Sequence, residues 1–389
     1  MWLKWLPWKF IVRRMARNHG FLDPIAVLSY LRRFSQPSEV QEPIELLRAG
    51  MVMHARGLMN SRAIQHNLDW VWPYWVERQF NPNDVAFVPR AFSLTHINLT
   101  HRNWTAVGVP DVDHYPLVDP AGGVTPLMDG WTLDAWVLDA DGELLIPSRI
   151  GPQSQRLVLD PNLAVVTETA NEASALQSEA YARLEGDRVV CSIEWTGRTQ
   201  GGGWLAIGLR PYNPEGVSFV HQVEKTEDGR AWKIEGRRLV EFMEPMERHA
   251  ASDYHHGDVV LHLDEEQAWR DAVTCDVGMA TAAALYRLEP GVERRVRVEV
   301  ALPGGANTDD RECVETAEQR WGDALAGTCR IRLPDERMQF LYDAAIRTMI
   351  LHSPGDVYPG PYTYRRFWFR DASVIIHAML MAGVFDRCE

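Results

Sequence analysis

The spacing of hydrophobic residues changes along the 389-residue chain, and this change restricts the possible folds more than any other feature. Residues 1–60 have helical spacing, residues 61–305 form short β-type runs separated by Pro, Gly, Asn and Asp, and the remaining residues are helical again. One hydrophobic core rarely extends over a chain of this length. The sequence therefore predicts a multidomain β plus α protein, in which a helical N-terminal segment precedes an antiparallel β domain and further helices follow it.

Three β strands are readily predicted within the central region. Residues 295–302 alternate apolar and mostly polar side chains, so the valines of this strand share one buried face. Residues 188–195 and 204–210 are also β-type runs, and the glycine-rich residues 196–203 between them lack the spacing of a phosphate-binding loop. The sequence thus predicts a flexible hairpin at this position.

The C-terminal helical region divides into a linker at 306–333 and a segment at 334–389. The linker is expected to contain one helix, from 312 to 325. A second helix is expected to begin at Pro334, because Pro is favoured in the first helical turn. Its expected apolar face consists of Leu341, Ala345, Thr348 and Met349.

A loop rich in Gly, Pro and Tyr at 353–362 separates the second helix from a third, which is expected to run from about Asp371 to about Val384. The apolar face of this third helix would need further neighbours. It comprises Val374, Ile375, Ala378, Met379 and Met381.

Composition and short motifs exclude several classes of function. The net charge of −13 argues against a nucleic-acid-binding protein, because neutralising phosphates needs a concentrated basic surface. His96 and His101 lack the spacing of a zinc site, and no motif for a cofactor stands out. We therefore expect neither a metal nor a cofactor.

The cysteines and the N-terminus indicate a cytoplasmic protein. Five cysteines without a CxxC pair are typical of free thiols in a reducing compartment. The N-terminus lacks the apolar run and cleavage site of a secretory signal. Residues 1–20 are basic and rich in Trp, which also suits contact with an anionic membrane surface, but packing of these rings against the β domain is favoured.

The most informative segment is 364–373, with the sequence YRRFWFRDAS. Trp368 has a face suited to the CH side of a sugar ring, Arg370 has a planar set of donors for adjacent hydroxyls, and Asp371 has a carboxylate to accept from them. An alternative is purely structural, because Asp is among the best N-cap residues and Asp371 precedes an apolar helix. The local chemistry alone does not decide between the two.

A second aromatic segment carries alternating rings at Trp70, Trp72 and Tyr74. These rings are predicted to form the core face of a strand, since large aromatic residues are mostly buried. A second surface that stacks on sugars is the alternative. We expect Asp69 and Glu77 to pair with Arg62 or Arg78 and to have no catalytic role.

The order of these elements resembles the six-hairpin glycosidase superfamily, which includes glucoamylase-like enzymes. In these proteins a β-supersandwich and a linker helix precede an (α/α)6 toroid, and the Trp-x-Arg-Asp motif at 368–371 and the run LRPYNPEG at 209–216 are similar to theirs. The resemblance implies that Trp368, Arg370 and Asp371 bind the sugar at the non-reducing end. It also implies that the catalytic acid and base lie on later loops of the toroid.

Residues 334–389 hold only two helices and a loop, so the resemblance implies the first hairpin of an incomplete toroid. We therefore expect a truncated chain with no catalytic residues, inactive by itself. The full protein would be an inverting glycoside hydrolase acting on an oligosaccharide or an α-glucan. Two alternatives are a non-catalytic carbohydrate-binding or scaffold module and a phosphorylase of the same architecture.

Overall fold

The computed structural model describes residues 70–84, 104–151, 153–186, 188–214, 216–303, 316–362 and 365–388, all within one structural unit. The helical segment predicted at 1–60, the proposed membrane contact of residues 1–20, and His96 and His101 lie outside these residues. Among the described helices, none is long and apolar enough to cross a lipid bilayer. The domain limits predicted from the sequence stay a prediction.

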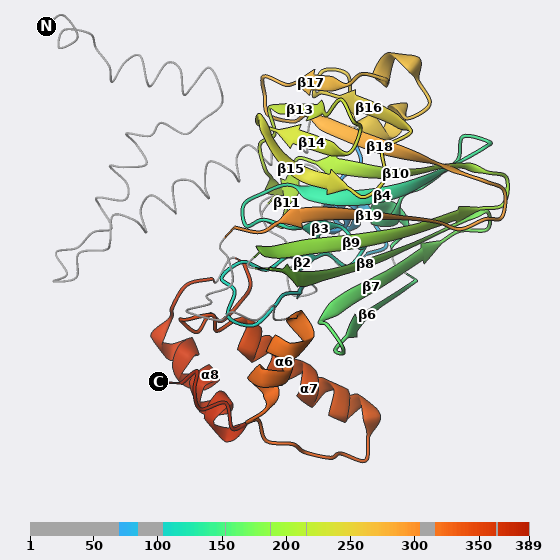
Figure 1. The fold of residues 1–389 in the computed structure, drawn as a ribbon. Coiled ribbons are helices and arrows are strands. Elements are labelled where there is room, and N and C mark those ends of the chain that lie inside the picture. Colours follow the sequence, from blue (N-terminus) through green and yellow to red (C-terminus); the bar gives the residue numbers. More distant parts are fainter. Residues whose placement is uncertain are drawn as a thin grey trace, which may run out of the picture. The chain divides into compact units, whose positions relative to one another are not determined.

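Two antiparallel sheets form the β domain (Figure 1). One sheet has the strand order β17-β13-β14-β15-β19-β9-β8-β7-β6. Its strands are β6 (Ser154–Val158), β7 (Ala164–Ala170), β8 (Ser174–Glu185), β9 (Arg188–Thr199), β13 (Gln222–Lys225), β14 (Ala231–Ile234), β15 (Arg237–Phe242), β17 (Ala272–Thr274) and β19 (Arg294–Ala301).

The other sheet has the order β1-β2-β3-β4-β10-β18-β16, with β5 paired to β4. Its strands are β1 (Thr105–Ala106), β2 (Leu117–Val118), β3 (Val124–Thr125), β4 (Thr132–Asp139), β5 (Leu144–Leu145), β10 (Gly203–Arg210), β16 (Arg248–Ser252) and β18 (Thr281–Leu288). A separate two-stranded ribbon consists of β11 (Tyr212–Asn213) and β12 (Gly216–Val217).

The core lies between the two sheets, where β4 packs against β8 and β9. Strand β8 alternates buried with more accessible positions, as a strand with one face in a core must. Trp136 on β4 and Trp195 on β9 have almost no exposed surface. Gly208 on β10 leaves room for the Trp136 indole, because an added Cβ would lie 2.0 Å from its ring. The predicted β-sandwich is therefore observed.

The predicted hairpin at 196–203 is wrong. Strand β9 continues to Thr199 and pairs with β8 and β19, whereas β10 pairs with β4 and β18 in the other sheet. The short connection between them passes from one sheet to the other. Gly202 and Gly203 have φ angles of 81° and 145°, and a Cβ on Gly203 would meet the Leu138 carbonyl oxygen at 2.1 Å. Glycine is thus needed for a crossing between sheets.

The linker helix α6 spans Ala317–Leu325 and begins five residues later than predicted. The hydroxyl of Thr316 accepts a hydrogen bond from the N–H of Gln319, and the Gln319 side chain accepts one from the N–H of Thr316. This capping box fixes the start of the helix. The indole N–H of Trp321 donates to the Gly108 carbonyl at 3.1 Å, which joins α6 to the β domain.

Helix α7 spans Glu336–Leu351, and its N-cap is Asp335, which accepts a hydrogen bond from Met338 N at 2.9 Å. The predicted first-turn position of Pro334 is therefore wrong, since Pro334 precedes the cap. The predicted apolar face is also wrong, because Leu341 is 51% exposed whereas Ile346 and Ile350 are buried. Helix α7 carries apolar residues on two sides, and the side with Ile346 and Ile350 faces the β domain.

The last helix, α8, spans Phe369–Met381, with Trp368 at the N-cap. Asp371 therefore lies in the first turn, and the N-cap role that was the alternative for this residue is not observed. Of the expected apolar face, Met379 is buried, whereas Val374 and Met381 are 68% and 74% exposed.

The three C-terminal helices lie beside one end of the β domain (Figure 1). A shared hydrophobic cluster connects the two parts. The β domain contributes Tyr115, Leu117 and Leu163, and the helices and the loop between α7 and α8 contribute Trp321, Ile346, Ile350, Leu351, Val357, Tyr362, Ala372 and Met379. The position of α8, and with it the start of the predicted sugar-binding motif, is thus set by packing on the sandwich.

Candidate functional site

The predicted motif lies at the surface, at the N-terminus of α8. The exposed fraction is 43% for Trp368 and 83% for Phe369, and the side chains of Arg370 and Asp371 are 89% and 31% exposed. Phe367 and Phe369 contact each other edge to face, with ring centroids 5.1 Å apart. The structure thus presents aromatic faces, a guanidinium group and a carboxylate together on one short segment.

The Arg370 guanidinium is oriented by a weak ion pair. Its Nη2 lies 3.3 Å from both oxygens of the Asp371 carboxylate. A solvent-exposed pair of this kind contributes little to stability, so the Arg370 donors are readily taken up by the acceptors of a ligand. Asp371 also lies in the first turn of α8, near the positive end of the helix dipole.

Contacts with the β domain hold the loop that precedes α8. The Arg365 side chain, which is 7% exposed, pairs with Asp113 at 3.1 Å and lies over the Tyr115 ring at 4.6 Å. The Tyr362 hydroxyl donates to Asp129 at 2.8 Å. His352 also stacks on the Tyr115 ring. Burial lowers the pKa of His352 to about 4. These contacts fix the chain a few residues before Trp368.

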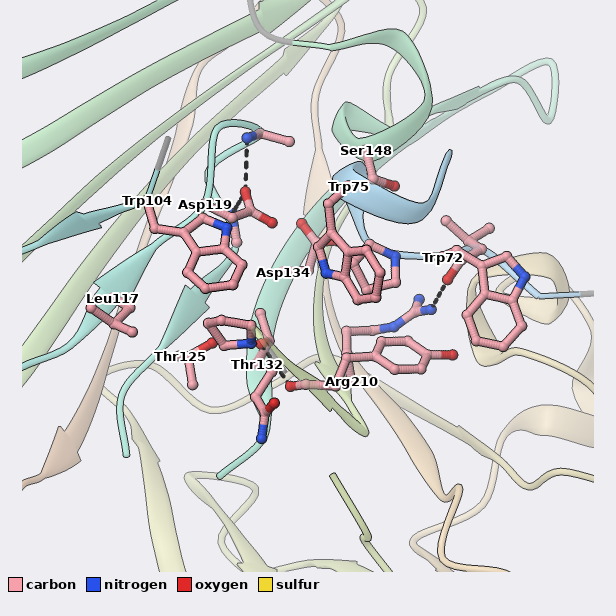
Figure 2. Close-up of a pocket in the computed structure, with 17 residues that line it drawn as sticks. Trp72, Trp75, Trp104, Leu117, Asp119, Thr125, Thr132, Asp134, Ser148 and Arg210 are labelled. Carbon is pink, nitrogen blue, oxygen red and sulfur yellow. Dashed lines mark hydrogen bonds between the residues drawn. The ribbon is translucent and has the colours of Figure 1, made fainter. Parts of the chain in front are cut away.

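A second set of polar residues, which the sequence did not predict, lines a narrow cavity in the β domain (Figure 2). Its volume is about 30 Å³. The aromatic part of its wall consists of Trp72, Trp75, Trp104 and Tyr212, and the charged part consists of Asp119, Asp134 and Arg210.

Asp119 follows β2 and closes a tight turn. Its Oδ1 accepts hydrogen bonds from the N–H groups of Ala121 and Gly123, at 2.7 and 2.9 Å. Burial raises the pKa of Asp119 to about 7, and the negative charge of Asp134 adds to this effect. Burial also raises the pKa of Asp134, on β4, to about 6, although the positive charge of Arg210 opposes the shift. Both carboxyl groups therefore titrate near neutral pH.

Arg210, at the end of β10, forms a buried ion pair with Asp258. Its Nη2 also donates to the carbonyl of Val71. The guanidinium lies 5.1 Å from the Trp136 ring and 5.3 Å from the Tyr212 ring. Since Asp258 accepts a hydrogen bond from Val71 N at 3.0 Å as well, the pair joins the segment around Val71 to the sandwich.

The aromatic segment at Trp70, Trp72 and Tyr74 is not a strand. Helix α4 (Tyr74–Phe80) begins at Tyr74, and the described residues before it, 70–73, belong to no strand. The predicted burial of Trp70 and Trp72 is correct, at 2% and 3% exposed. Glu77 accepts a hydrogen bond from Trp72 N at 2.9 Å and lies 3.6 Å from Arg149.

The predicted pairing of Glu77 with Arg78 is wrong, because each of these residues has another partner. Arg78 pairs with Asp84 at 2.7 Å, whereas Asp69 and Arg62 lie outside the described residues. His255 and His256 contact Asp276 at 3.1 Å and Asp253 at 2.8 Å respectively. Within the described ranges, no three His, Cys, Asp or Glu side chains are grouped as metal ligands would be.

No protein-family model matches the chain, and no curated protein matches it either. Solved structures do show similarity. A bacterial glucoamylase complexed with acarbose is 10% identical with a TM-score of 0.49, over 74% of this chain and 49% of that one. An α-mannosidase from Bacteroides thetaiotaomicron is 9% identical with a TM-score of 0.30, over 64% and 39%. A protein assigned as a kojibiose phosphorylase from the human microbiome is 9% identical with a TM-score of 0.31, over 65% and 36%.

The chain spans about half the length of the glucoamylase chain and less than two fifths of the other two. At 9–10% identity, the similarity concerns the fold alone.

Proposed function

We propose that the chain belongs to a glycoside-hydrolase-like protein and that Trp368, Arg370 and Asp371 bind an oligosaccharide or an α-glucan. One observation carries the proposal. Trp368 and Phe369 expose their rings beside an exposed guanidinium, on a segment that the β domain holds in place. Large aromatic side chains are ordinarily buried, so exposed rings that are grouped with charged groups favour ligand binding over a packing role.

The chemistry of the three residues suits a sugar. A pyranose has an apolar CH face, which stacks on an indole, and hydroxyl groups at its edge. The planar guanidinium of Arg370 donates two parallel hydrogen bonds to neighbouring oxygens. Asp371 accepts hydrogen bonds from hydroxyl groups, and its carboxylate lies 3.3 Å from Arg370 Nη2, so the two groups are placed to contact the same sugar.

We further propose that this chain binds the saccharide without hydrolysing it. Inverting hydrolysis needs two carboxyl groups roughly 6.5–9.5 Å apart on opposite sides of the bond. The segment 367–371 offers one, that of Asp371. We also propose a cytoplasmic location, since the cysteines of the described residues are free thiols, namely Cys191, Cys275, Cys329 and Cys388.

A glycan array followed by calorimetry tests the binding site. We expect the 389-residue chain to bind α-glucan oligosaccharides. Trp368→Ala and Arg370→Ala should each weaken binding at least tenfold, because each removes the binding free energy of a stacked ring or of a hydrogen bond to a charged group. Phe385→Ala and Arg238→Ala are controls, because both residues are exposed and lie outside the motif. Unchanged binding in both motif variants would remove the site assignment.

Incubation with an α-glucan tests the absence of catalysis. We expect no release of glucose in buffer and no release of glucose 1-phosphate when phosphate is added. Release of the second product alone would support the phosphorylase alternative. Release of either product would refute binding without turnover.

A further inference from the structure

A buried stack of three side chains joins the end of α7 to the segment before α8. His352, the C-cap residue of α7, stacks on Tyr115 with ring centroids 5.4 Å apart and an angle of 25° between the planes. The guanidinium carbon of Arg365 lies 4.6 Å from the centroid of the same Tyr115 ring. Through this stack, the β domain holds the chain a few residues before Trp368.

His352 lies in an environment that favours its neutral form. The residue is 9% exposed, and its Nε2 has no hydrogen-bond partner among the described residues. No carboxylate in the described part of the chain forms an ion pair with its ring, whereas other histidines, such as His256, do have one. Burial and the positive charge of Arg365 lower the pKa of His352 to about 4. A proton on this ring would be a second buried positive charge without a counter-ion.

The acidic groups of the adjoining loop have other partners. Asp113 pairs with Arg365 at 3.1 Å, and Asp111 pairs with Arg387 at 2.7 Å. Arg387 also donates to the carbonyl of Ser353, the residue after His352, at 3.0 Å. A second guanidinium group thus contacts the chain next to His352, and neither aspartate is free to balance a charge on the imidazole.

The other titratable neighbours do not balance such a charge either. Burial raises the pKa of Tyr115 to about 12. Burial also raises the pKa of Tyr358, whose N–H donates to the His352 carbonyl at 2.9 Å. Both phenols are therefore neutral in acid. Burial and the charge of Arg365 lower the pKa of His114, which would add positive charge if it took up a proton.

We propose that this stack is a pH-sensitive switch, in which proton uptake by His352 breaks its contact with Tyr115 and frees the segment that carries Trp368. The protonated ring is repelled by Arg365 and is fully hydrated only after it leaves the stack. The loop between His352 and Arg365 is then attached to Tyr115 at one end only. The proton comes from solvent and returns to it when the pH is raised.

The two pKa values of His352 determine how far the equilibrium moves. An imidazole exposed to water has a pKa of about 6.5, whereas the pKa in the stack is about 4. At pH 7.5 both forms are almost entirely neutral. At pH 4.5 the exposed ring is almost fully protonated and the stacked ring about one quarter, so the ratio of open to closed chains rises about 70-fold. The closed stack is therefore most stable above about pH 6.5 and loses stability as the pH falls from there toward 4.

Amide hydrogen exchange of the 389-residue chain at pH 7.5, 6.0 and 4.5 measures the opening, because a buried amide exchanges only when the chain opens. The reporters are the N–H of Tyr358, bonded to the His352 carbonyl, and that of Arg365, which donates to the Tyr362 carbonyl at 3.1 Å. After correction for the intrinsic effect of pH on exchange, protection of both amides should fall about 70-fold between pH 7.5 and pH 4.5. The amides of β9, in the sandwich core, should keep their protection.

Variants of His352 test whether this residue takes up the proton. His352→Phe keeps a flat ring on Tyr115 but does not titrate, so protection of the two reporter amides should vary less than about threefold over the same pH range. His352→Gln is smaller and also uncharged, and it gives the same test if the larger ring does not fit. His377→Phe is the matched control, because His377 is exposed on α8, and it should keep the pH dependence of the unmodified chain.

The effect on ligand binding rests on the proposed function. If the motif at 368–371 binds an α-glucan, the unmodified chain and His352→Phe should have equal affinity at pH 7.5, and the unmodified chain should bind more weakly at pH 4.5. Both chains carry Asp371, so comparing them at one pH removes any direct effect of acid on its carboxyl group. The exchange experiment uses no glycan, so it tests the switch even if the motif binds none.

Four results would overturn the proposal. Protection that stays constant from pH 7.5 to pH 4.5 would show that opening takes up no proton. A pH dependence that remains in His352→Phe and His352→Gln would assign the proton to another group, which would be His114 if His114→Phe removes the dependence. A parallel loss of protection in β9 would indicate acid unfolding of the whole unit. Equal glycan affinity of the unmodified chain and His352→Phe at pH 4.5 would show that opening does not free the motif.

Discussion

Gly208 leaves the space that the Trp136 indole occupies on the neighbouring strand, and replacing it with alanine tests the packing of the core. The added Cβ would lie 2.0 Å from Cη2 and 2.4 Å from Cζ3 of the ring. Trp136 has no exposed surface, so the ring has no free space into which it can turn. Overpacking a core costs about 1–3 kcal/mol, and a contact this short with a rigid ring places Gly208→Ala at about 2–3 kcal/mol.

Thermal and urea unfolding, followed by tryptophan fluorescence, measure this loss. At about 2–4 °C per kcal/mol, Tm should fall by roughly 4–12 °C. Gly322→Ala is the matched control, since Gly322 is an exposed residue within α6 and nothing lies within 4 Å of an added Cβ. The same substitution there should raise the stability of the helix by about 0.5–1 kcal/mol.

A Gly208→Ala variant within about 0.5 kcal/mol of the wild type would refute this reasoning, because it would mean that β4 and β10 separate at almost no cost. Equal destabilisation by Gly322→Ala would also refute it. In that case the loss would not depend on the contact with Trp136.

Three further perturbations have outcomes that follow from the described contacts. Asp258→Asn leaves Arg210 charged and buried without a partner, so urea unfolding should show a loss of about 3–5 kcal/mol, and a loss below 1 kcal/mol would contradict the pairing. Arg365→Ala removes the contact with Asp113 that holds the loop before Trp368, so the affinity for α-glucan should fall severalfold in calorimetry while the midpoint of unfolding changes little. The native state holds a proton on Asp119 that the unfolded chain releases, because burial raises the pKa of this carboxyl to about 7. The stability that the bound proton contributes is therefore lost as pH rises from about 4 to 7, and Asp119→Asn should gain roughly 2.5 kcal/mol relative to the wild type between pH 5 and pH 8.

The parts of the fold that depend on local pattern were predictable from the sequence. The alternation at 295–302 gave strand β19, and the β-type runs at 188–195 and 204–210 gave β9 and β10. The choice of partner strands is not local, so the crossing between sheets at Gly202 was mistaken for a hairpin. The same limit applies to α7, where the sequence offers two apolar sides and only packing selects one.

The two candidate sites differ in the same way. Trp368, Arg370 and Asp371 are neighbours in the sequence, so their grouping was visible as a motif. The residues of the cavity come from distant segments, and Asp134 and Arg210 meet only because β4 pairs with β10. A local signal existed for Asp119, which starts a Pro-Ala-Gly-Gly turn, but that signal predicts a turn and not a cavity.

The contacts of Arg365 and Tyr362 with Asp113 and Asp129 have a consequence for how ligand affinity varies among related chains. Substitutions in the loops around Asp113 and Asp129 would shift residues 367–369 at the start of α8 without contacting them. Affinity for a glycan would then be adjustable from residues more than two hundred positions earlier in the chain. If the helices were expressed without the sandwich, they would keep residues 368–371 but lose the contacts with Asp113 and Asp129 that position this segment.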